Sequence, residues 1–146
     1  MTEPFHLQVR FYELDPYGHV NHATYLQYFE AARVAWLADV GQSLDLLQET
    51  GVQLVVTAVA TRFVAPALLQ DDIKIETGLV AQRKVRAQWA QHAWRGDELI
   101  ACQRVNFAAV NLDGRPIRIP ATLIDAMAGF TIDEATLAKE LPELAL

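Results

Sequence analysis

One stretch determines how this chain is interpreted: Asp15-Pro16-Tyr17-Gly18-His19-Val20-Asn21-His22, which is followed directly by the apolar run Ala23–Leu37. Its proline and glycine favour turns and Asn21 is a preferred N-cap residue, so we expect a loop that ends where a long helix begins. The N–H groups in the first turn of a helix lack partners within the helix and carry partial positive charge, which suits a developing oxyanion. Asp15 lies just ahead of these donors, where a carboxylate can act as a base or a nucleophile. The stretch therefore indicates acyl-transfer chemistry.

The composition is typical of a globular protein. The chain has 146 residues, enough for one domain with its own core, and we expect a single domain over residues 1–146. The net charge of −6 provides no overall basic field, so we expect neither nucleic acid nor a membrane as a partner. The N-terminus lacks the features of a secretory signal, and the single cysteine, Cys102, makes no disulfide framework. We expect a soluble, cytoplasmic protein.

The apolar run is predicted to be a helix from His22 to about Val40, because Gly41 is a natural residue at the end of a helix. Its polar residues are spaced by three positions, so they drift around the helix axis instead of forming one polar face. We therefore expect the rest of the fold to wrap this helix. Glu30 and Arg33 are placed to form an i,i+3 ion pair, which is worth only tenths of a kcal/mol.

Period-two alternation of apolar and polar residues predicts antiparallel strands for much of the remaining chain. Turn dipeptides such as Gly96-Asp97 and Asp113-Gly114 separate them. The expected strands are Phe5–Tyr12, Val52–Ala65, Asp71–Arg83, Val85–Arg95 and Glu98–Leu112, and the expected short helices are Ser43–Gln48, Ala121–Ala128 and Asp133–Glu140. Helices segregated from a run of strands are the α+β pattern, and one long apolar helix suggests a helix inside a curved sheet.

One motif resembles the signature of hotdog-fold acyl-CoA thioesterases of the 4-hydroxybenzoyl-CoA thioesterase type: Asp15-x-x-Gly18-His19-Val20-Asn21-x-x-x-Tyr25-x-x-x-Phe29-Glu30-x-x-Arg33. The order of the expected elements matches this family along nearly the whole chain, and the segment Gly114–Pro120 is similar to the family's usual ending. The motif is more specific for the fold and superfamily than for the substrate. The resemblance implies an α+β hotdog fold, in which a curved antiparallel sheet of about five strands wraps a long central helix.

The resemblance also implies an activity that needs no cofactor, the hydrolysis of an acyl-CoA to a free carboxylic acid and coenzyme A. Asp15 would attack the thioester carbonyl or activate water, and the backbone N–H of His22 would polarise that carbonyl. Gly18 is expected to turn the chain with a positive φ and to let the backbone approach the thioester. The side chains of His19 and His22 occupy positions that vary in the family, so the resemblance assigns them no catalytic role.

Candidate substrate-binding residues come from two parts of the chain. Asn21 and Tyr25 belong to the motif, whereas Arg83, Lys84 and Arg86 form the one basic cluster of an acidic chain. Such a cluster is usually only a solvated turn. However, coenzyme A carries phosphates that cationic side chains bind, and in the resembled family this hairpin region approaches the nucleotide.

An oligomer is expected for two reasons. The resembled family implies a homodimer or a homotetramer with each active site at a subunit interface. Independently, the segment Val52–Phe63 is long and apolar and is guarded by a single charge, Arg62. An exposed strand edge of this kind is a liability unless it is paired, so we expect two subunits to join edge to edge in one continuous sheet.

The same residues allow other interpretations. Asp15 is also a plain turn former, because Asp-Pro commonly begins a turn. Asp15, His19 and His22 match no standard zinc spacing and lack a fourth ligand, so we expect no metal site. The sequence contains no Gly-x-Ser-x-Gly elbow, which argues against a serine-hydrolase route. The alternatives to a thioesterase are a non-catalytic acyl-CoA-binding hotdog module and, less favoured, a hotdog hydratase or dehydratase.

Overall fold

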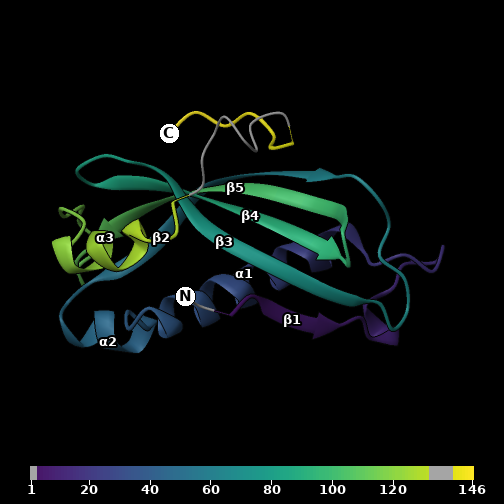
Figure 1. Ribbon diagram of the computed structural model, residues 1–146. Coiled ribbons are helices and arrows are strands. Elements are labelled where there is room, and N and C mark those ends of the chain that lie inside the picture. The colour runs from purple at the N-terminus through teal and green to yellow at the C-terminus, as the bar shows by residue number, and fades with distance from the viewer. Residues whose placement is uncertain (1–2, 132–139) are drawn as a thin grey trace.

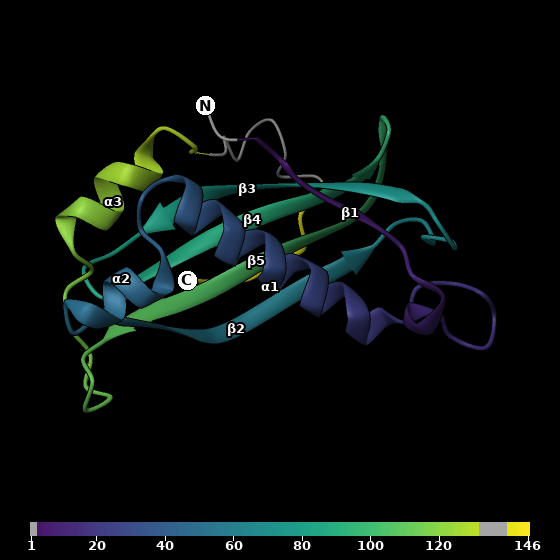
Figure 2. The same cartoon turned by 90° about the horizontal axis from the view of Figure 1, so that it is seen from below.

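A long helix, α1 (His22–Asp39), lies across one face of a curved antiparallel sheet (Figures 1 and 2). The computed structural model describes residues 3–131 and 140–146 of the chain. The sheet has five strands in the order β1-β3-β4-β5-β2. These are β1 (Phe5–Gln8), β2 (Gln53–Phe63), β3 (Asp72–Gln82), β4 (Arg86–Arg95) and β5 (Glu98–Val110). This confirms the α+β hotdog arrangement, and β2 lies at an edge of the sheet as expected.

The element boundaries follow turn residues that are visible in the sequence. The two-residue turn Gly96-Asp97 joins β4 to β5, and Gly96 adopts a φ of 59°, which glycine tolerates without steric cost. The short helices α2 (Leu44–Glu49) and α3 (Ala121–Ala128) also form where they were expected. The helix expected at Asp133–Glu140 lies outside the described residues, apart from Glu140 itself. No helix among the described residues is both long and apolar enough to cross a membrane.

The first strand is shorter than predicted. β1 ends at Gln8 instead of Tyr12, and a 3-10 turn, η1 (Phe11–Glu13), follows it. The Glu13 carboxylate accepts a hydrogen bond from the backbone N–H of Arg10 at 2.8 Å, and the Glu13 N–H donates to the Arg10 carbonyl at 3.0 Å. These local bonds turn the chain before it can continue as a strand, a competition that period-two alternation does not reveal.

The sheet covers only one side of α1. Phe29 and Trp36 are buried against the sheet, whereas Leu26 and Val34 are each 42% exposed. We expected the rest of the fold to wrap α1. Within one chain, it covers only the side of the helix that faces the sheet. The exposed apolar side chains leave part of the helix surface available to another molecule.

A row of polar side chains crosses the sheet beneath α1. Thr61, Gln103, Gln91 and Thr77 are cross-strand neighbours on β2, β5, β4 and β3. Gln103 donates to the Thr61 hydroxyl at 2.7 Å, and Gln91 donates to the Thr77 hydroxyl at 3.1 Å. Arg33 reaches this row from the helix and donates to the side-chain oxygens of Gln91 at 2.9 Å and Gln103 at 3.1 Å. The row therefore links four strands to the helix.

The prediction of an ion pair between Glu30 and Arg33 is wrong. Arg33 is buried and bonds to two neutral amides, while Glu30 remains exposed. Burial lowers the pKa of the Arg33 guanidinium, and the charge of Glu30 opposes this shift. Gln91 also donates to the backbone carbonyl of Phe29 at 2.9 Å, so the row holds both a side chain and the backbone of α1.

The last described residues, 140–146, cross the opposite face of the sheet (Figure 1). Gln88, Arg104 and Asn106 each donate to a backbone carbonyl of this segment at 2.8 Å. The Cys102 thiol donates to the first carbonyl of the segment at 2.7 Å, and burial raises its pKa to about 11. The single cysteine is therefore a buried packing residue held protonated at neutral pH.

Arg33→Met keeps much of the side-chain volume but removes both donors from the polar row. We expect the free energy of unfolding to fall by about 1–3 kcal/mol, because two buried amide oxygens lose their donors. Urea unfolding of the variant beside the wild type measures this difference. Arg118→Met replaces an exposed arginine and is the matched control, with an expected change below about 0.5 kcal/mol. Equal effects of the two substitutions would contradict the role given to the row.

Candidate active site

The stretch Asp15–His22 forms a tight loop that leads into α1. The Asp15 N–H donates to the His19 carbonyl at 2.7 Å, and the Gly18 N–H donates to the Asp15 carbonyl at 3.0 Å. Gly18 adopts a φ of 79°, which residues with a side chain rarely adopt. The structure confirms that Gly18 turns the chain.

The two oxygens of the Asp15 carboxylate have different surroundings. Oδ1 accepts hydrogen bonds from the backbone N–H groups of Tyr17 at 2.8 Å and His19 at 3.1 Å. Oδ2 has no hydrogen-bond partner within the described part of the chain. Asp15 is thus a turn former through one oxygen, and its other oxygen does not take part in the turn. The two interpretations of this residue are compatible.

The start of α1 offers one backbone donor. The side-chain oxygen of Asn21 accepts from the N–H of Ala23 at 2.9 Å, as expected of an N-cap. The N–H of His22 has no acceptor within residues 3–131 and 140–146. It therefore remains available to a carbonyl oxygen at the positive end of the helix.

A pocket of about 320 Å³ lies between this loop, the start of α1 and the end of β2. Four residues predicted from the sequence line it: Asp15, His19, His22 and Tyr25. The opposite wall is formed by residues 63–66. The pocket brings a carboxylate, two imidazoles and a helix N-terminus to one place.

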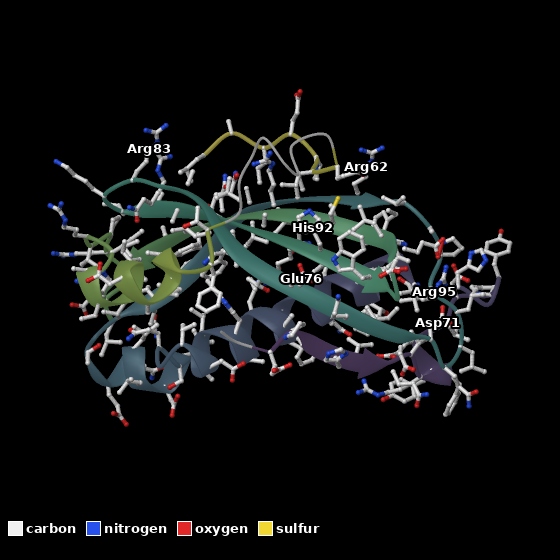
Figure 3. All side chains as sticks on the ribbon, in the orientation of Figure 1. Arg62, Asp71, Glu76, Arg83, His92 and Arg95 are labelled. Atoms are coloured by element: carbon white, nitrogen blue, oxygen red, sulfur yellow. The ribbon has the colours of Figure 1, made fainter. Side chains whose placement is uncertain are left out.

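The basic cluster does not line this pocket within one protomer. Arg83, Lys84 and Arg86 lie in and beside the turn between β3 and β4. Figure 3 shows Arg83 at the opposite end of the molecule from Asp71 and Arg95, which lie beside the pocket wall. One chain alone therefore does not bring the two groups of predicted site residues together.

Tyr25 holds the pocket wall in place. Its hydroxyl accepts a hydrogen bond from the backbone N–H of Ala67 at 3.1 Å, and the N–H of Val20 donates to the Ala67 carbonyl at 2.9 Å. The Tyr25 ring also packs edge-on against Phe63 at 5.2 Å between centroids. Burial raises the pKa of Tyr25, so the hydroxyl stays protonated near neutral pH.

Two further supports of the site were missed by the sequence analysis. Arg95 donates to the Pro66 carbonyl at 3.0 Å and to the Asp71 carboxylate at 2.6 Å, which braces the wall from the end of β4 (Figure 3). Glu13 is buried behind the loop and accepts from the Tyr28 hydroxyl at 2.8 Å. The only sequence signal for Glu13 is a charged residue within an apolar segment, which does not identify its partner.

Comparison with known proteins identifies the family. The family model of the Thioesterase-like superfamily matches residues 9–135. The chain belongs to this superfamily. The acyl-CoA thioesterase YbgC of Haemophilus influenzae is 28% identical over 118 residues, which cover 80% of this chain and 87% of that protein. The chloroplastic acyl-acyl carrier protein thioesterase ATL3 of Arabidopsis thaliana is 27% identical over 119 residues, covering 80% of this chain and 63% of the relative.

Solved structures share the fold of this superfamily member. A probable thioesterase from Bartonella henselae is 29% identical with a TM-score of 0.76, and the match covers 80% of this chain and 98% of that chain. The dynemicin thioesterase matches with a TM-score of 0.82 at 22% identity, covering 90% of this chain and 98% of that chain, a likeness of fold alone. The hotdog fold and thioesterase family predicted from the motif are confirmed.

Tyr25→Phe removes only the oxygen that binds the Ala67 N–H. We expect the free energy of unfolding to fall by about 1–3 kcal/mol, because a buried backbone donor loses its acceptor. Tyr12→Phe is the control, since Tyr12 is 67% exposed and its loss of a hydroxyl should change stability little. Thermal and urea unfolding of both variants measure the difference. Unchanged stability in Tyr25→Phe would show that the hydroxyl does not hold the wall.

Proposed function

We propose that this protein is an acyl-CoA thioesterase, which hydrolyses a thioester to a free carboxylic acid and coenzyme A. The observation that carries the proposal is that two groups meet at one pocket: the Asp15 carboxylate and the N–H of His22. Asp15 Oδ2 and this N–H both lack a hydrogen-bond partner among the described residues. Membership in the thioesterase-like superfamily supports the reaction type. The similarity to the acyl-CoA thioesterase YbgC supports coenzyme A as the leaving group.

The chemistry needs a group that attacks the thioester and a group that stabilises the oxyanion. The substrate carbonyl oxygen accepts from the His22 N–H, which makes the carbonyl carbon more electrophilic. Asp15 Oδ2 then serves in one of two ways. It attacks the carbon, expels the thiolate and leaves an anhydride that water hydrolyses. Alternatively, it takes a proton from a water molecule whose oxygen attacks the carbon, and the tetrahedral intermediate then breaks its C–S bond and expels the thiolate, which receives the proton from Asp15. Oδ1 stays bonded to the loop N–H groups and holds the carboxylate in place.

We propose that the complete site contains two copies of the chain. β2 is an edge strand, and its Val55, Val56 and Val59 are 44%, 46% and 43% exposed. Antiparallel pairing of β2 with the β2 of a second copy reverses the strand direction across the interface. The β3–β4 turn of one protomer then lies toward the Asp15 loop of the other. This supports a role for Arg83, Lys84 and Arg86 as phosphate-binding residues supplied by the partner.

Asp15→Asn tests the proposed chemistry. The amide oxygen can still accept the two loop N–H bonds, but the side chain is neither a base nor a good nucleophile. We expect turnover to fall at least about 10²-fold, while the melting temperature stays near that of the wild type. Thiol release from a panel of acyl-CoAs measures turnover, with the exposed carboxylate variant Asp72→Asn as control. Near-wild-type turnover in folded Asp15→Asn would contradict the role that the mechanism gives to Asp15.

Acyl-CoA binding by the wild type without thiol release would favour a non-catalytic module instead.

Val59→Glu tests the proposed pairing of β2. Placing a charge on the exposed apolar edge should prevent association, so we expect a dimer or larger species for the wild type and a monomer for the variant. Sedimentation velocity at micromolar concentration measures the species present. Ala128→Glu is the control, because Ala128 is exposed on α3, and α3 packs against β3, which β4 and β5 separate from β2. A clean monomer of the wild type with full activity would contradict the shared site.

A further inference from the structure

A second pocket, of about 520 Å³, is larger than the Asp15 pocket and shares no lining residue with it. It lies between the C-terminal half of α1 and the β1 and β3 side of the sheet. Trp36, which lines it, is about 21 Å along the helix from His22. The larger pocket contains no counterpart of the Asp15 carboxylate beside a free helix N-terminus. Catalysis at the Asp15 loop therefore does not account for this larger pocket.

The pocket forms where the edge of β3 is uncovered. β1 pairs with β3 only as far as Ile75. The next backbone hydrogen bond on this edge of β3 is at Leu79, whose N–H donates to the Phe130 carbonyl at 3.1 Å. Between these points, no described strand pairs with the outer edge of Glu76–Gly78. The hollow thus borders backbone polar groups as well as side chains.

The interior of the pocket is apolar and partly aromatic. Phe5, Trp36 and Phe130 supply rings, and Trp36 and Phe130 meet edge-on with centroids 5.9 Å apart. Ala32 and Ala35 also line the pocket from α1, and their small side chains occupy little of its space. Such a surface suits an aromatic or short aliphatic body.

The ionisable side chains that line the pocket are three carboxylates and two imidazoles. The carboxylates belong to Glu3, Asp39 and Glu76, the imidazoles belong to His6 and His92, and no lysine or arginine is among the described residues of the lining. Lys74 lies 3.5 Å from Glu76, but both side chains are substantially exposed, so the pair is weak. Burial lowers the pKa of His92, which also lines the pocket, so this imidazole adds no positive charge near neutral pH.

We infer that this second pocket binds a protonated amine carried on an aromatic or short aliphatic body. The carboxylates attract an ammonium group and repel anions, while the rings and alanines receive the apolar part. The same charges disfavour an acyl-CoA or a carboxylic acid product at this place. The pocket is therefore a binding site separate from the proposed active site. It lies on the opposite side of α1 from the exposed edge of β2.

Three probes of similar shape test the charge preference on the full chain: 2-phenylethylammonium, 2-phenylethanol and 3-phenylpropionate. Isothermal titration calorimetry at neutral pH and low salt should show the ammonium binding with a Kd below about 1 mM. The neutral alcohol should bind at least about tenfold more weakly, and the anion more weakly still. No binding of the ammonium up to about 10 mM, or equal binding of the alcohol, overturns the inference.

Variants then locate the site. Asp39→Asn combined with Glu76→Gln should weaken the ammonium at least about tenfold, and Ala35→Leu should reduce binding by filling the space. Glu49→Gln, an exposed carboxylate on α2, is the matched control and should bind like the wild type. Asp15→Asn should also bind the ammonium like the wild type, whatever it does to turnover. Weakened binding in Asp15→Asn, or unchanged binding in the Asp39 and Glu76 variant, overturns the inference.

Discussion

The buried guanidinium of Arg33 is the constraint on which the arrangement of the helix depends. Moving this charge out of water is costly, and no carboxylate among the described residues forms an ion pair with it. Hydrogen bonds to Gln91 and Gln103 offset part of that cost, and these amides are held in turn by threonines. Because Gln91 also binds the Phe29 carbonyl, sliding α1 along the sheet would break several buried bonds at once. The helix therefore has one favoured position.

The position of α1 determines the geometry at its N-terminus. His22 begins the helix, so its N–H is fixed relative to the sheet by the same contacts that fix Arg33. The Asp15 loop is fixed separately, by bonds within itself and by the Val20 and Ala67 contact to the pocket wall. Two independent supports therefore converge on one pocket. Such convergence holds a carboxylate and a backbone N–H group in fixed positions, which is what a preorganised catalytic site requires.

Local signals in the sequence predicted the turn and the helix start at the candidate site better than they predicted the contacts that support them. Gly18 and the Asn21 cap act within a few residues, so their roles are visible from neighbouring residues alone. Arg33 bonds to residues 58 and 70 positions away, and spacing along the helix suggested the nearby Glu30 instead. The early end of β1 was missed because the Glu13 carboxylate competes for the Arg10 N–H. Contacts that depend on tertiary placement of a polar side chain have no periodic signature.

The distribution of charge is consistent with one chain serving ligands of opposite sign. A net charge of −6 does not by itself exclude an anionic substrate, because screening limits exposed charges to about 8 Å at physiological salt. Arg83, Lys84 and Arg86 are near neighbours at one turn and create a local positive field. The carboxylates Asp39 and Glu76 surround the other pocket, near Trp36, which is about 21 Å along α1 from His22 and thus beyond twice the screening length. At this separation, screening prevents the acidic pocket from repelling the acyl-CoA that we propose to bind at the start of α1.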